Sequence, residues 1–183
     1  MLSYPALSHV ALQTPRLILR EFAAADAEAI QVYAGDPEVT RFTSFGPNTP
    51  ELTNVVLAHW IQEQTRSPRT EWPLAVVRRE DGTLIGGTGF GVPDWSTGAA
   101  IFGYVLRRSA WGQGYATEAG QVVADWALGE VGVRRLVAHC EPANLASVSV
   151  LSKIGFAQKE GLVSMPRTDG EVRRYWTFVK ERQ

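Results

Sequence analysis

The sequence predicts an α+β fold in a single domain. Several short runs alternate apolar and polar residues with the period of a strand, and other stretches space their apolar residues as an amphipathic helix does. Clusters of glycine, proline and aspartate separate these runs. With 183 residues, of which 45% are hydrophobic, the chain can bury one sizeable core. We therefore expect one domain over residues 1–183.

The first half is expected to begin with one strand and two helices. Residues 16–22 alternate as a strand, and residues 26–33 have a helical pattern that ends at the turn Gly35-Asp36-Pro37. A second helix is expected to start at Thr49, because this hydroxyl cap precedes a proline, and to run to about Thr65. The residues expected on its buried face are Leu52, Val55, Val56 and Trp60.

Three strand-like runs follow, at residues 72–79, 83–91 and 99–106. The turn Glu80-Asp81-Gly82 joins the first two, and the loop from Pro93 to Gly98 joins the last two. Because these connections are short, we expect the three runs to form an antiparallel meander.

The second half is expected to alternate helices and strands. After glycines at 112 and 114, apolar residues at helical spacing predict a helix that ends near Gly129. A short apolar strand at 135–140 and a helix at 144–154 follow. The remaining predicted elements are a strand at about 156–164, a turn at Thr168-Asp169-Gly170 and a strand at 171–179.

Charge and composition exclude several classes of protein. The formal net charge is −1, so there is no global field to attract nucleic acid or an anionic membrane surface. The single Cys140 excludes an internal disulfide, offers no metal framework and fits a reducing compartment. No charge-free apolar run reaches the ~18 residues of a spanning helix, and the N-terminus MLSYPALSHV lacks the order of a signal peptide. We expect a cytoplasmic protein without a nucleic-acid, membrane or metal partner.

The segment GYVLRRSAWGQGYATEAG at residues 103–120 contains the clearest indication of function. It joins a predicted strand to a predicted helix through Gly112 and Gly114, which let a ligand approach the backbone closely. The helix start points unpaired N–H groups into this turn and therefore favours an anion. Arg107 and Arg108 favour phosphate, because a guanidinium matches phosphate oxygens two at a time. A simple tight turn beside two solvated arginines is the alternative for this segment alone.

Residues 144–156, NLASVSVLSKIGF, form a second segment of interest. The segment starts with a helix cap, places apolar residues at 145, 148, 151 and 154, and stops at Gly155 before Phe156. It is predicted to be the helix that follows the strand at 135–140.

Together the two segments resemble the GCN5-related N-acetyltransferases, and within them the RimJ/RimL-like branch that acetylates protein N-termini. The family's first motif, Q/R-x-x-G-x-G/A, matches WGQGYA at residues 111–116, with Trp111 in place of the first Gln or Arg. That tryptophan followed by GxGYATEA is itself similar to the N-terminal-acetylating branch. The second motif matches Asn144, Ser147 and the sequence Lys153-Ile154-Gly155-Phe156. A third, weaker match is TPRLILREF at 14–22, so the resemblance covers nearly the whole chain.

The resemblance implies a fold, a cofactor and a set of site residues. The implied fold is a mixed, mostly antiparallel sheet whose central strands splay apart, flanked by about four helices, whereas periodicity alone gives only α+β. Acetyl-CoA is the implied co-substrate, and its pyrophosphate is expected at the turn. The implied cofactor-binding residues are Tyr104, Val105, Leu106, Arg107, Gly112, Gln113, Gly114, Tyr115, Ala116, Thr117, Asn144 and Lys153.

Ser147 is the implied catalytic acid, which protonates the departing thiolate. Many other acetyltransferases use a tyrosine four residues before the Gly-Phe pair, but that position is Leu151 here. Asn144 is implied to hydrogen-bond the pantetheine arm. In any helix, however, Asn144 could act as a cap and Ser147 as a first-turn hydroxyl.

The general base is not identified. Related enzymes often have a glutamate two residues before the Gly-Tyr pair, and that position is Ile101 here. Glu118 is better explained as a charge that complements the helix dipole. The candidates that could act through a water are Asp94, Glu71 and His139. An α-amine with a pKa near 8 is already partly neutral at pH 7. The rate of acetyl transfer is therefore expected to follow the ionisation of the amine itself, unless a group of the enzyme accepts the proton.

The expected reaction is direct attack of a primary amine on the thioester in a ternary complex. The acceptor expected first is the α-amine of a protein or peptide, and small amines such as an antibiotic, a polyamine or an amino acid are the alternative. A non-catalytic acetyl-CoA sensor is a further alternative, because a base is missing. We expect a monomer or a homodimer. Trp60 and Trp126 are expected in the core, whereas Trp95 is expected either to line the acceptor cleft or to cover the sheet.

Overall fold

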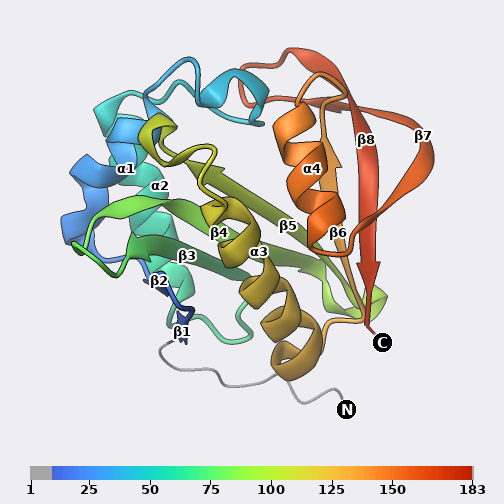
Figure 1. The fold of residues 1–183 in the computed structure, drawn as a ribbon, viewed down its shortest axis with the longest axis horizontal. Coiled ribbons are helices and arrows are strands. Elements are labelled where there is room, and N and C mark those ends of the chain that lie inside the picture. The colour runs from blue at the N-terminus through green and yellow to red at the C-terminus, as the bar shows by residue number, and fades with distance from the viewer. Residues whose placement is uncertain (1–9, 183) are drawn as a thin grey trace.

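The computed structural model describes residues 10–182, which form one eight-stranded sheet with helices on both faces (Figure 1). The strands lie in the order β1-β2-β3-β4-β5-β6-β8-β7, and only β5 and β6 are parallel. The strands are β1 (Ala11–Gln13), β2 (Leu17–Glu21), β3 (Glu71–Arg78), β4 (Leu84–Asp94), β5 (Ala99–Leu106), β6 (Arg135–Cys140), β7 (Ala157–Pro166) and β8 (Val172–Glu181). The α-helices are α1 (Ala27–Ala34), α2 (Pro50–Glu63), α3 (Tyr115–Trp126) and α4 (Leu145–Lys153). The predicted α+β class and the antiparallel meander of β3, β4 and β5 are confirmed.

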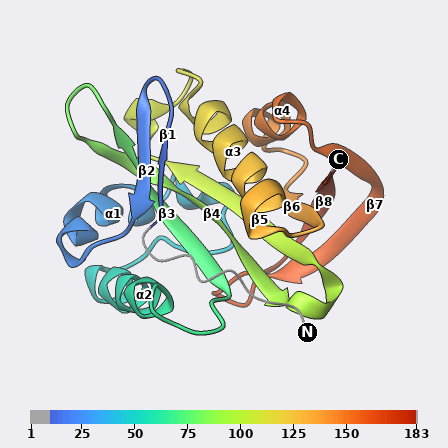
Figure 2. The ribbon, with the colours of Figure 1, turned by 90° about the horizontal axis from the view of Figure 1, so that it is seen from below.

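The helices divide between the two faces of the sheet (Figure 2). α3 and α4 cover one face over the larger core, which includes Phe102, Leu136, Ile154 and Phe178. α1 and α2 cover the other face only over β2, β3 and β4, where Phe22, Tyr33 and Leu57 form the smaller core. The second face is therefore left without a helix over β5, β6 and β8.

β5 and β6 separate after a short contact, as Figure 1 shows. Their parallel pairing consists of Ala99 with Arg135, Ala100 with Leu136 and Ile101 with Val137. Beyond that point β5 continues beside β4, and β6 continues beside β8. The sheet thus opens between its two central strands, which confirms the splay that the resemblance implied.

Two details of the helices differ from the sequence predictions. Leu52 and Val55 are exposed rather than buried, because α2 turns Thr53 and Leu57 to the core and Thr53 donates a hydrogen bond of 2.6 Å to Gln31. The helix predicted to end near Gly129 continues as a π-helical turn, Ala127–Val131, whose apolar side chains stay in the core. Gly132, with φ of 82°, ends it.

The N-terminal segment on which the signal-peptide prediction depends lies outside the described residues, apart from Val10. None of the helices described in residues 10–182 is long and apolar enough to cross a membrane. The short strand β1, which pairs with β2, was not predicted.

Candidate active site

The turn between β5 and α3 presents a row of unpaired backbone donors. Gly112 and Gly114 have φ of 72° and 80°, a region that residues with a side chain rarely adopt. Within residues 10–182, the N–H groups from Gly112 to Thr117 donate to no backbone or side-chain acceptor, whereas the next N–H, that of Glu118, bonds to the Gly114 oxygen at 3.1 Å. Six consecutive donors at a helix start fit an anionic group with several oxygens.

An ionic contact between Arg16 and Glu118 holds this turn in position. Glu118 accepts hydrogen bonds from the Thr14 hydroxyl at 2.5 Å and from the Arg16 guanidinium at 2.6 Å, and Arg16 also donates to the Gln113 oxygen at 2.9 Å. Burial alone would raise the pKa of Glu118, but these hydrogen bonds outweigh it and lower that pKa. Glu118 therefore anchors α3 to the β1–β2 hairpin, in agreement with the structural role favoured from the sequence.

Main-chain groups of β5 line the opening of the sheet. The Arg107 N–H bonds to the Ile85 oxygen on β4, so the odd-numbered residues of this regular strand direct their N–H and C=O groups to β4. The groups of Phe102, Tyr104 and Leu106 consequently face β6, which has already diverged. The Leu106 oxygen accepts a hydrogen bond from the Trp111 indole at 2.8 Å, which leaves the Tyr104 groups and the Leu106 N–H for a ligand.

Ser147 stands at the same opening, on the face covered by α3 and α4. Asn144 caps α4 by accepting a hydrogen bond from the Ser147 N–H at 3.2 Å. The Tyr104 hydroxyl lies 2.8 Å from the Ser147 hydroxyl, and either can be the donor. Burial raises the pKa of Tyr104 above its ordinary range despite this contact, so the phenol stays protonated. The side-chain contact of Tyr104 was not foreseen, because the two residues lie 43 positions apart and only the Tyr104 main chain was implicated.

The buried Cys140 thiol lies beside this pair. Its sulfur donates weak contacts to the Glu141 oxygen at 3.5 Å and the Asn144 oxygen at 3.6 Å. Burial raises the pKa of the thiol, and the nearby Ser147 hydroxyl partly opposes that effect. At neutral pH the group is therefore a neutral thiol.

The opposite face of the opening has room beside β5. The Ile101 side chain points to the face that α1 and α2 leave bare, and Ile101 is 42% exposed, whereas Gly103 on the same face has no side chain. A Cβ atom built on Gly103 would meet nothing within 4 Å. His139 lies on this face of β6 beside Thr177 of β8, and its Nδ1 is 3.4 Å from the Thr177 hydroxyl. An amine could therefore reach the opening from this face.

The other two candidate bases are farther from the opening. Asp94 accepts a hydrogen bond of 2.8 Å from the Ser96 N–H, which lowers the pKa of its carboxyl. It is the last residue of β4 and pairs with Ala99, the first residue of β5, so it is far along the strand from Tyr104. Glu71 is 3.2 Å from the His59 ring and pairs with Gly91, which in turn pairs with Ile101. Two strand spacings, about 10 Å, therefore separate the Glu71 and Ile101 backbones.

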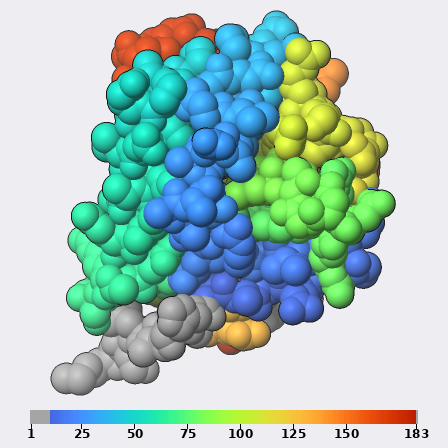
Figure 3. Space-filling view, turned by 90° about the vertical axis from the view of Figure 1, so that its left-hand side faces the viewer, coloured from blue at the N-terminus to red at the C-terminus, as the bar shows by residue number. Residues whose placement is uncertain are grey.

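An arginine bridge closes the upper end of the bare face. Arg167, at the end of β7, is 7% exposed and donates to the backbone oxygens of Thr43 at 2.5 Å, Gly46 at 2.8 Å and Thr40 at 3.3 Å. The Thr168 N–H adds a bond of 2.9 Å to the Ser44 oxygen. The loop of residues 35–49, coloured cyan, consequently lies against the red β7–β8 turn (Figure 3). We call this contact the arginine bridge.

Arg173 of β8 extends the arginine bridge. Its guanidinium donates to the Arg41 oxygen at 2.6 Å, to Glu141 at 2.9 Å and to Glu171 at 2.7 Å. These bonds join the loop 35–49, the start of β8 and the segment after β6. No pattern in the sequence indicated the arginine bridge, because its acceptors on the loop are main-chain oxygens.

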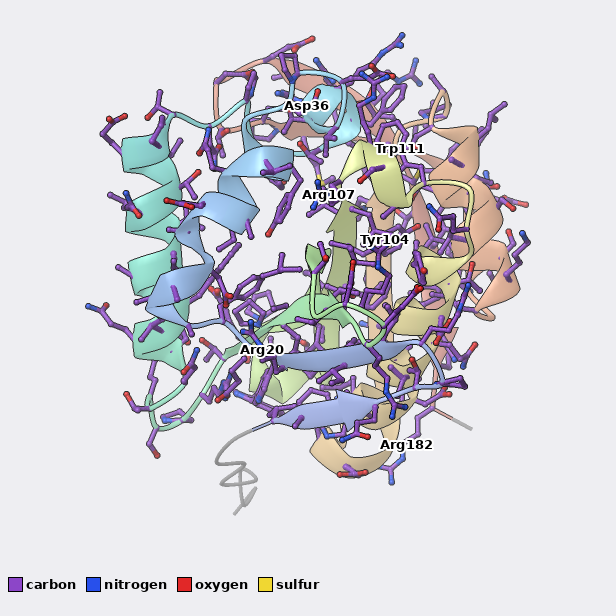
Figure 4. The ribbon with its side chains drawn as sticks, turned by 60° about the vertical axis from the view of Figure 1, so that its left-hand side comes forward. Arg20, Asp36, Tyr104, Arg107, Trp111 and Arg182 are labelled. Carbon is purple, nitrogen blue, oxygen red and sulfur yellow. The ribbon has the colours of Figure 1, made fainter. Side chains whose placement is uncertain are left out.

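Not every predicted site residue lies with the others. Tyr104, Arg107 and Trp111 gather near the end of β5 (Figure 4), but by strand alternation the Arg107 side chain points to the bare face, opposite Tyr104. Arg108 forms an exposed ion pair with Glu38 at 2.7 Å. Lys153 is exposed in the last turn of α4, about 12 Å along the helix from Leu145. The structure does not bring Lys153 to the opening.

The tryptophans have structural positions. Trp126 is buried in the larger core, and Trp60 is partly buried and stacks on Phe22 with ring centroids 4.7 Å apart. Trp95 packs edge-on against Trp72 at 5.8 Å, near the strand ends opposite the glycine turn. Of the two alternatives for Trp95, covering the sheet is therefore the observed one.

Known proteins resemble this chain in sequence and in fold. Residues 16–157 match the family model described as an acetyltransferase (GNAT) domain. The uncharacterized N-acetyltransferase p20 of Bacillus licheniformis is 33% identical over 152 residues, which are 83% of this chain and 84% of that protein. Mycobacterium smegmatis RimJ in complex with CoA-disulfide superposes with a TM-score of 0.81 at 22% identity, covering 98% of this chain and 90% of that one.

A third similar protein is RimL, a ribosomal L7/L12 alpha-N-protein acetyltransferase in complex with coenzyme A. It superposes with a TM-score of 0.80 at 18% identity, covering 94% of this chain and 98% of the other. At such low identities the two superpositions establish only the fold, whereas the match to the family model establishes that the chain belongs to that family. The splayed sheet is thus that of a GNAT domain, and the chain belongs to the GNAT family of acetyl-CoA-dependent N-acetyltransferases.

Proposed function

We propose that this enzyme transfers acetyl from acetyl-CoA to the α-amine of a protein or peptide N-terminus, by direct attack in a ternary complex. The observation that supports it best is the opening between β5 and β6, which connects a face bearing anion-binding donors with a bare face. A thioester entering from one face can meet an amine arriving from the other without a covalent enzyme intermediate. Such an arrangement supplies catalysis chiefly by holding the two reactants together.

The coenzyme half uses the groups around the glycine turn. The six free N–H groups of Gly112 to Thr117 fit the pyrophosphate, with the positive end of α3 behind them. The Tyr104 main-chain groups and the Leu106 N–H, which have no strand partner beyond the splay, are proposed to bond the pantetheine arm and the thioester oxygen as β6 would in a continuous sheet. The Asn144 side chain already caps α4, so its proposed contact with the arm uses its remaining amide hydrogens.

Ser147 is proposed to give its proton to the sulfur when the C–S bond breaks. The Tyr104 phenol can donate to the Ser147 oxygen, which leaves the serine hydrogen free to point at the sulfur. The same bond stabilises the serine oxygen after it has lost its proton. This contact favours Ser147 as an acid over a residue that only belongs to the first turn of a helix.

The α-amine acceptor is supported by two further features. RimL, which shares the fold, is named as an alpha-N-protein acetyltransferase. The acceptor half also has no carboxylate at Ile101, which favours an amine that is partly neutral at pH 7 over a lysine side chain. The free, buried thiol of Cys140 is consistent with a reducing compartment such as the cytoplasm.

Turnover tests this proposal most directly. Thioester consumption should be measured with acetyl-CoA against a panel of N-terminal peptides, lysine peptides blocked at the α-amine, polyamines, amino acids and aminoglycosides. Coenzyme binding should be measured in parallel by calorimetry. Preference for free peptide N-termini is the expected result. Preference for a small amine would identify that amine class as the acceptor instead. Tight binding of acetyl-CoA without turnover on any amine would identify a non-catalytic sensor.

A further inference from the structure

On the second face of the opening, His139 is a side chain that can take a proton. His139 pairs in register with Thr177, while its neighbours Ala138 and Cys140 point into the larger core under α3 and α4. Strand alternation therefore turns the His139 ring to the bare face, away from Ser147. The acid and the imidazole consequently stand on opposite faces of one opening.

His139 lies at the same level along the sheet as the β5 main-chain groups that are proposed to bind the thioester. Ile101 pairs with Val137 in the parallel ladder, so two residues farther along each strand Gly103 and His139 stand at the same level. Tyr104, whose main chain faces the opening, is the next residue. Because Gly103 has no side chain and its Cβ position is empty, the space beside the imidazole is open to an acceptor.

The imidazole is also chemically available. Within the described chain, the Thr177 hydroxyl at Nδ1 is the one hydrogen-bond partner of the ring, at 3.4 Å. Nε2 is thus left for a ligand. Burial lowers the pKa of His139 below its ordinary value of 6.5, so the ring is neutral and can accept a proton at pH 7.

Other titratable groups on this face belong to separate contacts. On β8, Tyr175 is buried with a raised pKa, and Arg173 is held by Glu141 and Glu171. Across the face, Glu71 pairs with His59. β5 contributes Ile101 and Gly103, which do not titrate, and Arg107, directly after β5, adds a cationic side chain to the same face.

We propose that His139 is the general base, accepting a proton from the acceptor nitrogen as that nitrogen attacks the thioester. The N–C bond forms and the C–S bond breaks, one proton passes from nitrogen to His139 Nε2, and one passes from Ser147 to sulfur. Solvent then removes the imidazolium proton and restores that of Ser147, so the products are an amide and free CoA and the enzyme is unchanged. This assignment rests on the proposed acetyl transfer.

The test compares the parent with His139→Gln over pH 5 to 9, using the peptide that the parent acetylates best. The ratio of the two kcat/KM values is the informative quantity, because the acceptor's own ionisation cancels in it. At pH 8 we expect a ratio of about 10² or more. As the pH falls through the lowered pKa of His139 the ratio should fall toward one, since the parent loses its base when His139 is protonated.

A rescue separates proton transfer from a merely structural role. Ile101→Glu, introduced into His139→Gln, places a carboxylate on the same face of the neighbouring strand, where the exposed Ile101 has room for it. We expect kcat/KM of this double variant to be at least tenfold higher than that of His139→Gln. The gain should persist to lower pH than the activity of the parent, because a carboxylate loses its proton near pH 4. His59→Gln, at the other described histidine, is the matched control and should act as the parent.

The outcomes are distinct. A ratio that stays near one at every pH, or a loss that does not depend on pH and is not rescued, overturns His139 as the base. A pH-dependent loss in Glu71→Gln with none in His139→Gln would also overturn it and assign the role to Glu71. If the parent acetylates no amine at all, the proposed function itself fails and this inference with it. Unfolding curves and acetyl-CoA affinity should match among all variants.

Discussion

The proposed coenzyme half and the proposed acceptor half of this molecule are built by different kinds of residue. The coenzyme half consists of two strand–helix units, β5–α3 and β6–α4, whose helix starts and strand ends supply backbone groups. The acceptor half consists of a bare sheet face, the loop 35–49 and the β7–β8 turn, which side chains from distant positions hold together. Backbone recognition requires local glycines and caps that a sequence displays, whereas the second kind of construction leaves no local pattern.

The sharpest test of this contrast is Gly114→Val. A side chain at this left-handed position displaces the N–H donors, so acetyl-CoA affinity should fall by about 100-fold or more. Calorimetric titration with acetyl-CoA measures the effect.

Gly82→Val is the matched control for that prediction. Gly82 also has a left-handed φ, of 70°, and nothing lies within 4 Å of its Cβ position, but it sits in the β3–β4 turn. It should lose similar stability, about 1–2 kcal/mol, and bind acetyl-CoA as the parent does. Equal affinities for the two variants would contradict the pyrophosphate site.

Ser147→Ala is expected to have the next largest effect. Maximal turnover should fall about 10²-fold while acetyl-CoA affinity changes little, because the proton is needed only as the C–S bond breaks. Steady-state kinetics with parallel binding data separate the two quantities. Ser149→Ala, an exposed hydroxyl of the same helix, should leave both unchanged. If Ser147→Ala keeps full turnover, Ser147 is only a residue of the first turn of α4.

Arg167→Met probes the acceptor half alone. Removing the guanidinium takes one hydrogen-bond donor from each of three loop oxygens, so the loop 35–49 should loosen and KM for the acceptor should rise about tenfold. The free energy of unfolding should fall by about 2 kcal/mol, and acetyl-CoA affinity should stay the same. Arg174→Met, at an exposed position of β8, is the control. A parallel loss of acetyl-CoA affinity would show that the two halves are not independent.

Arg108→Ala should change least. Its guanidinium is 57% exposed and pairs with an equally exposed Glu38, and such surface pairs contribute about 0–1 kcal/mol. We expect less than a threefold change in acetyl-CoA affinity at physiological ionic strength. A tenfold loss that disappears at high salt would instead place Arg108 on a phosphate.

Most of the fold and the coenzyme half could be predicted from the sequence. β5 and β6 lie within a residue of their predicted bounds, and Thr49 caps α2 as its hydroxyl and the following proline indicated. Such features are local, because caps, turns and periodicity depend on neighbouring residues. The roles of Gly112 to Thr117, Asn144 and Ser147 remain predictions, although the structure places these residues around one opening.

Features of the acceptor half could not be predicted from the sequence. Leu52 and Val55 are apolar yet exposed, since Gln31, 22 positions away from Thr53, satisfies that threonine and turns it inward. Likewise His139 could not be distinguished from Glu71 and Asp94, because only the parallel register shows which of them stands level with Gly103. In both cases a pairing between distant segments decides the result.

The arginine bridge has a consequence for how this enzyme can diverge. Arg167 and Arg173 hold the loop 35–49 through its main-chain oxygens, which every amino acid possesses. Substitutions along the loop can therefore alter the side chains offered to an acceptor while the anchoring bonds persist. Mutational tolerance should be high at the exposed positions of this loop and low at Arg167, so that new acceptor preferences can arise without a new scaffold.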